Sequence, residues 1–354
     1  MSFISDRIKG ILFLSFTIFS WIGSAVFIKI IFTTMDFSKA FLMIYIADGL
    51  TCLYAFSFLR NCFNRRSRTD SDSDSDSDPA SKTDTSNVNY IKLAIIFAPC
   101  LFVPNYLYAE GLKYTTVASV EIISNSSFIF IFVLSIPILG TKFSWVKLLS
   151  ICGAFGGVVL IQLIDYKSES TNPNEHYLRG DIICSIATIM YAFYGIYLKK
   201  YVPDDSKFNW FGFFGILGIS VLVMFFPMFF ILDACGIEEF EFPEPKLLFY
   251  LLINGICGTV LSNYTWARSV VLLSPLIAEL GIGITIPLGL IANYFLEKKG
   301  YNPYYLLGSA YIMAGFVIAT LHDYYDEKVE EERRQALRKT FLTESNRTSI
   351  IISD

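Results

Sequence analysis

Two stretches of this chain match each other without a gap. Residues 105–166 align with residues 263–324 at a constant offset of 158. The matched pairs include Asn105 with Asn263, Glu121 with Glu279, and Gly157 with Gly315. Duplicated hydrophobic segments are typical of transporter folds, in which two structural repeats meet near the middle of the membrane and bind the solute there. Residues that recur in both copies are therefore the first candidates for function.

The composition places the chain in a membrane. Of its 354 residues, 54% are hydrophobic and 17% are charged, which is more apolar surface than one soluble core can bury. A membrane-spanning helix needs about 20 apolar residues. The chain contains ten such stretches, at residues 9–32, 40–59, 91–109, 115–138, 146–164, 179–198, 210–232, 247–267, 271–296 and 304–321. We therefore expect an all-α integral membrane protein with ten transmembrane helices.

The distribution of basic residues predicts the orientation. With a cytosolic N-terminus, ten spans place connections that carry Arg65, Lys142 and Lys200 in the cytosol, and the acidic connection around Glu238 on the opposite side. Basic residues favour the cytosolic side, so both termini are expected there. Because each half then has an odd number of spans, the second five-helix repeat is inverted relative to the first.

These spans divide the chain into four regions, the first of which contains a long loop. The first five-helix repeat covers 1–164, a lumenal linker covers 165–178, the second repeat covers 179–321, and a charged cytosolic tail covers 322–354. The loop 60–90 contains an alternating Ser-Asp run, which has no apolar residues to bury and is expected to be disordered. Two interpretations of this run stay open, a solvated spacer and a phosphorylation tract.

Three carboxylates lie well inside predicted spans and away from the span ends, namely Asp48, Glu121 and Glu279. A carboxylate at the centre of a membrane helix costs about 2.5–3.5 kcal/mol, so it usually faces a cavity or a partner. One interpretation is a polar cavity that recognises a cationic or hydroxyl-rich solute, or a carboxylate that carries a coupling proton. The other is a structural role, with bonds to Lys29 or to neighbouring serine hydroxyls.

Other polar residues accompany these carboxylates. Ser124 and Asn125 follow Glu121 at helical spacing and form one stripe, although small polar residues also allow helices to pack closely. Near Thr285, Pro287 and several glycines predict a break whose carbonyls either coordinate solute or belong to a bent, packed helix. The candidate solute-binding residues are therefore Asp48, Glu121, Ser124, Asn125, Asn263, Tyr264, Glu279 and Thr285.

Motifs of other functional classes are missing from the sequence. It has no Walker loop, nucleophile elbow, paired-histidine motif or glycine-rich dinucleotide turn, so we expect no enzyme and no cofactor. Its cysteines show no metal-binding or disulfide spacing, so no metal is expected. The absence of a basic patch argues against nucleic-acid binding.

Several segments together resemble a known family. They are 114–119, 261–267, Ser274-Pro275, 285–288 and, near the N-terminus, 21–24. In order and spacing they are similar to the drug/metabolite transporter superfamily (EamA-like), in particular to the F subgroup of solute carrier family 35 and its fungal thiamine-repressible relatives. This resemblance implies two inverted repeats, alternating access, a central cavity lined by spans three, four, eight and nine, and a eukaryotic endomembrane such as the vacuole or Golgi.

The leading hypothesis is a secondary active transporter of a small polar metabolite, embedded in membrane lipids, with coupling to protons left open. A nucleotide-sugar antiporter is the first alternative. It requires a basic cavity for the diphosphate, and spans three, four, eight and nine supply only Arg268, near an end. A second alternative is a membrane receptor or scaffold that has the transporter fold without transport.

Overall fold

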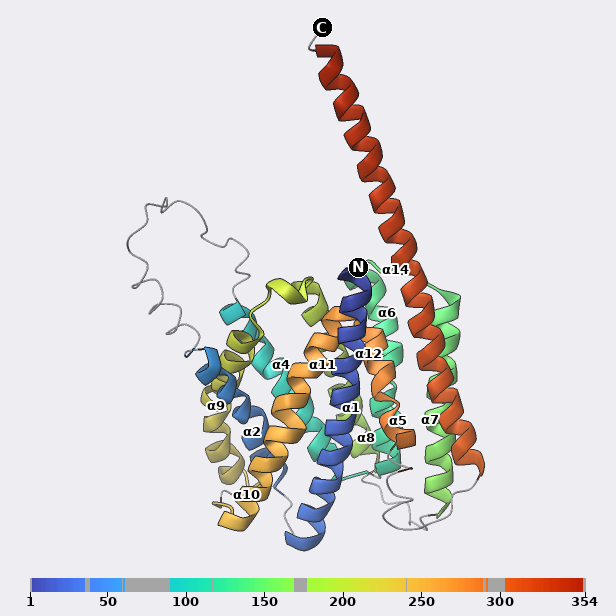
Figure 1. The fold of residues 1–354 in the computed structure, drawn as a ribbon. Helices are drawn as coiled ribbons and strands as arrows, with labels where there is room; N and C mark the ends of the chain where they lie inside the picture. Colours follow the sequence, from blue (N-terminus) through green and yellow to red (C-terminus); the bar gives the residue numbers. More distant parts are fainter. Residues whose placement is uncertain are drawn as a thin grey trace, which may run out of the picture.

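The computed structural model describes residues 2–35, 39–58, 60, 90–115, 117–168, 177–239, 241–288, 291 and 303–352. Within these ranges all regular structure is helical (Figure 1). The Ser-Asp run and most of the predicted linker 165–178 lie outside the described residues.

Most predicted spans appear as helices close to their expected bounds. The first half contains α1 (Ser2–Met35), α2 (Ala40–Gly49) with a 3-10 turn (Leu50–Cys52), α4 (Tyr90–Gly111), α5 (Val117–Asn125), α6 (Ser127–Leu139) and α7 (Trp145–Ser168). The second half contains α8 (Tyr177–Tyr201), α9 (Trp210–Ala234), α10 (Pro245–Asn254), α11 (Leu261–Leu272), α12 (Pro275–Ile282) and α14 (Pro303–Ile352). A π-helical segment, Gly255–Val260, joins α10 to α11.

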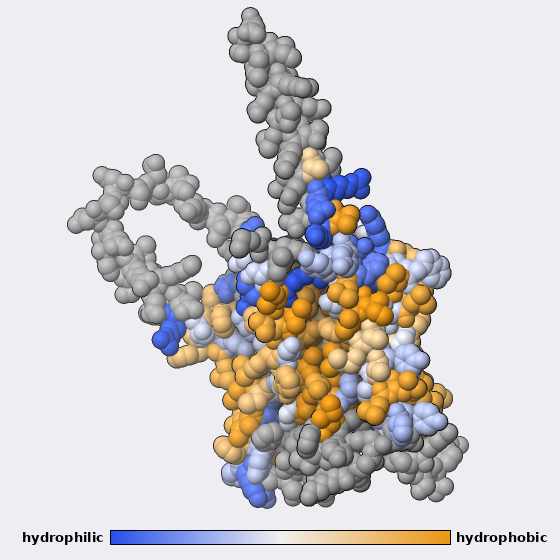
Figure 2. Space-filling view, turned by 45° about the vertical axis from the view of Figure 1, so that its right-hand side comes forward, coloured by the Kyte–Doolittle hydropathy of each residue, from blue (hydrophilic) through white to orange (hydrophobic). Residues whose placement is uncertain are grey.

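Among the described residues, eight helical segments are long and apolar enough to cross a membrane. They are Ala40–Phe58, Tyr90–Gly111, Ile122–Leu139, Trp145–Ile164, Leu178–Tyr201, Trp210–Ala234, Pro245–Leu272 and Pro303–Glu330. The 34-residue helix α1 and the shorter apolar segment Pro275–Leu288 lie in the same bundle. Exposed apolar side chains form a belt around the bundle, with hydrophilic residues gathered where α14 leaves it (Figure 2). This surface is the one expected of an integral membrane protein.

Two predicted spans, the fourth and the ninth, are interrupted. The fourth breaks at Ser126, whose hydroxyl donates to the carbonyl of Ile123 at 2.5 Å. The predicted ninth span begins inside α11, and a break at Leu273 and Ser274 separates α11 from α12. A turn at 283–284 ends α12 one turn before Pro287, because proline cannot donate the helical hydrogen bond at that position. The predicted break near Pro287 is therefore present.

Helices α7 and α14 pack against each other in opposite directions (Figure 1). Two glycines allow this approach: a Cβ at Gly157 would lie 2.5 Å from the carbonyl oxygen of Gly308, and one at Gly315 would lie 2.6 Å from that of Ser150. Gly157 and Gly315 are equivalent in the sequence repeat, and so are Ser150 and Gly308. The contact between the two helices is therefore made twice, by equivalent residues.

Both the N-terminus and the far end of α14 lie at the same end of the bundle (Figure 1). The 50 residues of α14 correspond to a helix of about 75 Å, so it extends well beyond the apolar belt. Helix α1 is tied to it by Arg7, which pairs with Asp323 at 3.4 Å and also with Glu327. On the same side of α14, Lys147 of α7 pairs with Asp323 at 2.7 Å.

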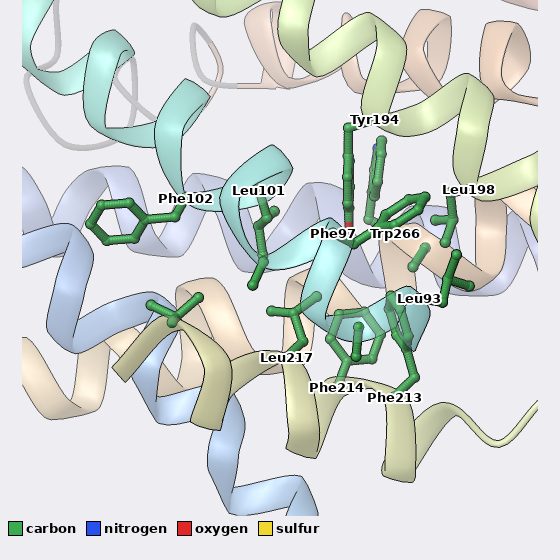
Figure 3. Packing of buried hydrophobic residues seen from close by; sticks show 14 of the residues in the cluster. Leu93, Phe97, Leu101, Phe102, Tyr194, Leu198, Phe213, Phe214, Leu217 and Trp266 are labelled. Atoms are coloured by element: carbon green, nitrogen blue, oxygen red, sulfur yellow. The ribbon is translucent and has the colours of Figure 1, made fainter. Parts of the chain in front are cut away.

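The largest apolar core lies where α4, α8, α9 and α11 meet. Figure 3 shows Phe97 of α4, Tyr194 of α8, Phe213 of α9 and Trp266 of α11 converging there. All four side chains are buried. This core holds the helices that carry the polar residues described next.

Candidate functional site

Asp48 is buried near the end of α2, with 1% of its surface exposed. The side-chain amide of Asn105, on α4, donates to both of its carboxylate oxygens, at 3.1 and 3.3 Å. Its backbone carbonyl accepts a bond from the hydroxyl of Thr51 at 2.6 Å, within the 3-10 turn that follows. Asp48 thus lies at an irregular point of its helix, and an amide is its hydrogen-bond partner.

Glu279 is buried on α12, with 7% of its surface exposed. Its Oε1 accepts a bond from the hydroxyl of Ser127, the first residue of α6, at 2.9 Å. Its Oε2 is buried and has no hydrogen-bond partner among the described residues. Because an unsatisfied buried carboxylate oxygen is costly, this atom is a strong sign of a missing ligand or proton.

Aromatic rings on α8 and α11 lie near these carboxylates. The Tyr191 hydroxyl, on α8, lies within electrostatic range of the carboxylates of both Glu279 and Asp48. The Trp266 ring lies 5.2 Å from that of Tyr191 and 5.4 Å from that of Tyr194, measured between centroids. Tyr191 therefore joins the two carboxylates and the rings into one group, which we call the central cluster: Asp48, Asn105, Ser127, Tyr191, Tyr194, Trp266 and Glu279.

Polar atoms of two aromatic members of the cluster are free. The Tyr194 hydroxyl and the Trp266 indole nitrogen are buried, and no hydrogen-bond partner for either lies in the described part of the chain. The same holds for the side-chain nitrogen of Asn263, one turn before Trp266 on α11, and for the Ser124 hydroxyl on α5. Buried polar groups are normally satisfied, so such a concentration favours a binding site over simple packing.

The other predicted site residues have different surroundings. Tyr264 is stacked between Tyr54 and Phe211, and its hydroxyl accepts a bond from Arg268 at 3.1 Å, so its contacts are outside the central cluster. Asn125 is buried at the end of α5, and Thr285 is half-buried just beyond the turn at 283–284. Glu121 is on α5, but its side chain lies outside the described part of the structure.

Two basic residues near the spans, Arg268 and Lys199, already have hydrogen-bond partners. Arg268 donates to Asp205 at 2.8 Å, makes a second contact with that carboxylate, and lies over the Phe13 ring at 4.5 Å. Lys199 donates to the backbone carbonyl of Val271. The Lys29 side chain, a predicted alternative partner for the carboxylates, lies outside the described part of the structure.

The π-helical segment between α10 and α11 provides further contacts. Wider π-helical turns change the backbone hydrogen bonding and are often found at functional sites. Here the carbonyl of Val260 accepts a bond from the Tyr54 hydroxyl at 3.1 Å, and that of Cys257 accepts one from Ser20. These bonds attach α1 and the helical residues that follow the 3-10 turn Leu50–Cys52 to the segment that leads into α11, the helix that carries Asn263 and Trp266.

Sequence reasoning identified the two buried carboxylates but missed several of their neighbours. Asn105 was noted as one of the residues matched in the repeat, but no role was predicted for it. Tyr191 and Tyr194 were not among the predicted site residues. The pairing of Asn105 with Asn263 in the repeat was a usable signal for the first. Within the described residues, no group of three metal-ligating side chains gathers anywhere.

Comparison with known proteins agrees with this architecture. Residues 8–163 match the EamA-like transporter family. A solved crystal structure matches with a TM-score of 0.63 over 91% of this chain and 99% of its own, at 12% sequence identity, which shows a shared fold alone.

Similar proteins include transporters from animals and fungi. Solute carrier family 35 member F5 of Bos taurus is 34% identical over 66% of this chain and 45% of its own length, so the chain spans about half the length of that relative. The thiamine-repressible mitochondrial transport protein of Saccharomyces cerevisiae is 25% identical over 88% of this chain and 91% of its own. An uncharacterized vacuolar membrane protein of the same yeast is 29% identical over 64% of this chain and 61% of its own. The predicted resemblance is confirmed: the chain is similar to EamA-like transporters and to members of solute carrier family 35.

Proposed function

We propose that this protein is a secondary active transporter that carries a small polar solute across an endomembrane by alternating access. The observation that carries the proposal is the central cluster, in which buried carboxylates from α2 and α12 are held by an amide and a hydroxyl. Carboxylates buried among membrane helices usually mark a solute or ion pathway. The free Oε2 of Glu279 is the atom at which we expect solute or a coupling proton to bind.

The proposed mechanism needs two inverted five-helix repeats. The doubled contact between α7 and α14 supports this arrangement, because equivalent glycines meet equivalent partners in antiparallel helices. In such folds two similar halves rock about a solute site that lies between them. Glu121 and Glu279 are equivalent in the repeat, as are Ser127 and Thr285. We therefore propose that Glu121 and Thr285 contribute to the site from the other half.

Glycine substitutions test the doubled contact. We expect Gly157→Ala and Gly315→Ala each to lower the free energy of unfolding by about 1–3 kcal/mol, because each new methyl group meets a backbone carbonyl oxygen. Gly156→Ala is the matched control, since a Cβ there meets nothing within 4 Å. Equal stability of Gly157→Ala and Gly156→Ala would remove this support for the repeats.

Orientation is testable separately. Ten spans with a cytosolic N-terminus place both termini in the cytosol. Tags at the two ends should then be cleaved by protease added to sealed vesicles whose cytosolic side faces outward. Protection of either tag would refute the ten-span topology.

A nucleotide-sugar antiporter is disfavoured by the state of Arg268. A diphosphate needs cationic partners, and the Arg268 guanidinium is already held by Asp205 and Tyr264. The names of the relatives point to more than one organelle, one mitochondrial and one vacuolar. We propose the vacuole or Golgi for this protein, with localisation of the tagged chain as the test.

Transport itself is tested by reconstitution. Purified protein in liposomes should take up at least one polar metabolite from a mixed pool, and a pH gradient should change the rate if protons are coupled. Empty liposomes provide the control for leakage. If no metabolite accumulates under either condition, the transporter proposal fails and the receptor or scaffold alternative is favoured.

A further inference from the structure

The central cluster has an excess of carboxylates over cations. Asp48 and Glu279 are both buried, and in the described part of the chain no lysine or arginine lies within ion-pairing distance of either. Nearby basic groups have other partners, since Arg268 contacts Asp205 and Lys199 contacts a backbone carbonyl. A buried charge is tolerated only when it is compensated. Within the described part of the chain, compensation of these carboxylates is therefore left to a proton or to a bound cation.

The rings of the cluster favour a particular kind of compensation. Tyr191 interacts with both carboxylates, and its ring lies 5.2 Å from Trp266 and 6.0 Å from Tyr194. The faces of such rings attract cations, and quaternary ammonium groups are commonly recognised by aromatic side chains of this kind. A group of rings beside two carboxylates thus suits a cation with an organic, weakly hydrated head.

The free polar atoms indicate what the rest of such a cation carries. The Trp266 indole can donate one hydrogen bond, and the Tyr194 hydroxyl can donate or accept one. Figure 3 shows these two side chains next to each other, on α11 and α8. A hydroxyl or amide on the ligand would satisfy both, and the side-chain nitrogen of Asn263 offers another donor.

We infer that the solute of this site is a small organic cation with an ammonium or similar onium head and a hydrogen-bonding substituent. The head lies against the Tyr191 ring between Asp48 and Glu279, and the substituent points toward Tyr194 and Trp266. This inference rests on the proposed transport function and specifies its substrate class.

Binding of radiolabelled choline to the purified protein tests the inference. Choline supplies a quaternary head and a hydroxyl, and 3,3-dimethyl-1-butanol is its neutral counterpart of nearly the same shape. We expect unlabelled choline and tetramethylammonium to compete at concentrations at least about tenfold lower than the neutral alcohol, because the carboxylates and rings act on charge. Equal competition by the neutral alcohol would overturn the inference.

Variants locate the binding. Tyr191→Leu and Glu279→Gln should each weaken choline binding by at least about tenfold. Tyr201→Leu is the matched control on the same helix. The Tyr201 ring is exposed, and among the described aromatic rings its neighbour is Tyr197. Unchanged binding in both cluster variants would overturn the assignment to this site.

The two experiments distinguish a wrong substrate class from a wrong function. A protein that moves neutral or anionic metabolites in liposomes, but binds neither choline nor tetramethylammonium, is a transporter with another substrate class. A protein that moves no metabolite refutes transport and the inference together.

Discussion

Carboxylates at the end of the helix bundle and at its centre have different partners. Near the N-terminal end, Asp323 lies 2.7 Å from Lys147 and 3.4 Å from Arg7. At the centre, the side-chain partners of Asp48 and Glu279 within the described residues are an amide and a hydroxyl. The ion pairs at the end join helices, and their opposite charges neutralise each other. The carboxylates at the centre can instead be neutralised by a bound ligand. We therefore expect the ion pairs at the end to stabilise the fold and the carboxylates at the centre to bind solute.

The largest effect is expected at the centre. Glu279→Gln keeps the shape of the side chain and its contact with Ser127 but removes the charge, so uptake should fall by at least about tenfold or lose its response to pH. Expression and unfolding temperature should stay close to those of the unmodified protein. Glu121→Gln should lower uptake in the same way, because Glu121 occupies the equivalent position in the other repeat. Normal uptake by both variants across acidic and neutral pH would make these carboxylates structural.

The next effect is expected at the end of the bundle. Arg7→Met removes the partner of Asp323 and Glu327 and should lower the free energy of unfolding by about 1–2 kcal/mol, because Arg7 is buried and Glu327 is half-exposed. Uptake per folded molecule should not change. Lys9→Met is the control, since Lys9 is exposed and pairs only with Asp6 in the described residues. Loss of uptake in Arg7→Met with unchanged stability would contradict the comparison.

A smaller effect is expected at Glu241, outside the spans. Its hydrogen bond with Lys39, together with the lysine charge, lowers the pKa of this exposed carboxyl. A lowered pKa in the folded protein means that the contribution to stability is present at neutral pH and is lost as the pH falls through that pKa. Glu241→Gln should therefore change the unfolding temperature slightly at neutral pH and not at strongly acidic pH. If the change in unfolding temperature caused by Glu241→Gln were larger at acidic pH than at neutral pH, the pKa of Glu241 would not be lowered in the folded protein.

The smallest effect is expected from the Ser-Asp run. Deleting residues 69–78 should leave uptake within about twofold, because changes in the length of a polar loop cost little. Uptake by the deletion variant in liposomes, relative to the full chain, is the measurement. Complete loss would show that the run is more than a spacer.

Much of the fold was predictable because membrane helices are fixed by apolar length and by proline. Most of the spans appeared close to their expected bounds, eight of them as helical segments long enough to cross a membrane, and the break before Pro287 followed from its missing backbone donor. The break at Ser126 and the π-helical segment were not predicted, since both depend on side-chain bonds to carbonyls. The predicted charged tail is helical to Ile352, well past the expected end of the last span.

The candidate site was predictable in part for a related reason. Buried carboxylates stand out in an apolar span, so Asp48 and Glu279 were found. Aromatic residues do not stand out in a chain that is 16% aromatic, so Tyr191 and Tyr194 were missed. Tyr264 was selected from the repeat, but its ring packs against Tyr54 and Phe211. Glu238 was used only for orientation, yet it accepts bonds from the backbone nitrogens of Phe41 and Leu42 at the start of α2.

Chemical labelling with dicyclohexylcarbodiimide tests the central claim most directly. This apolar reagent enters membranes and modifies carboxyl groups that can take up a proton, whereas carboxylates held by a cation stay ionised and react poorly. We predict that mass spectrometry will find the label on Glu279, together with loss of uptake, and that Asp323 will remain unmodified. Labelling of Asp323 in place of Glu279 would contradict the claim that the centre of the bundle, and not its end, holds the uncompensated charge.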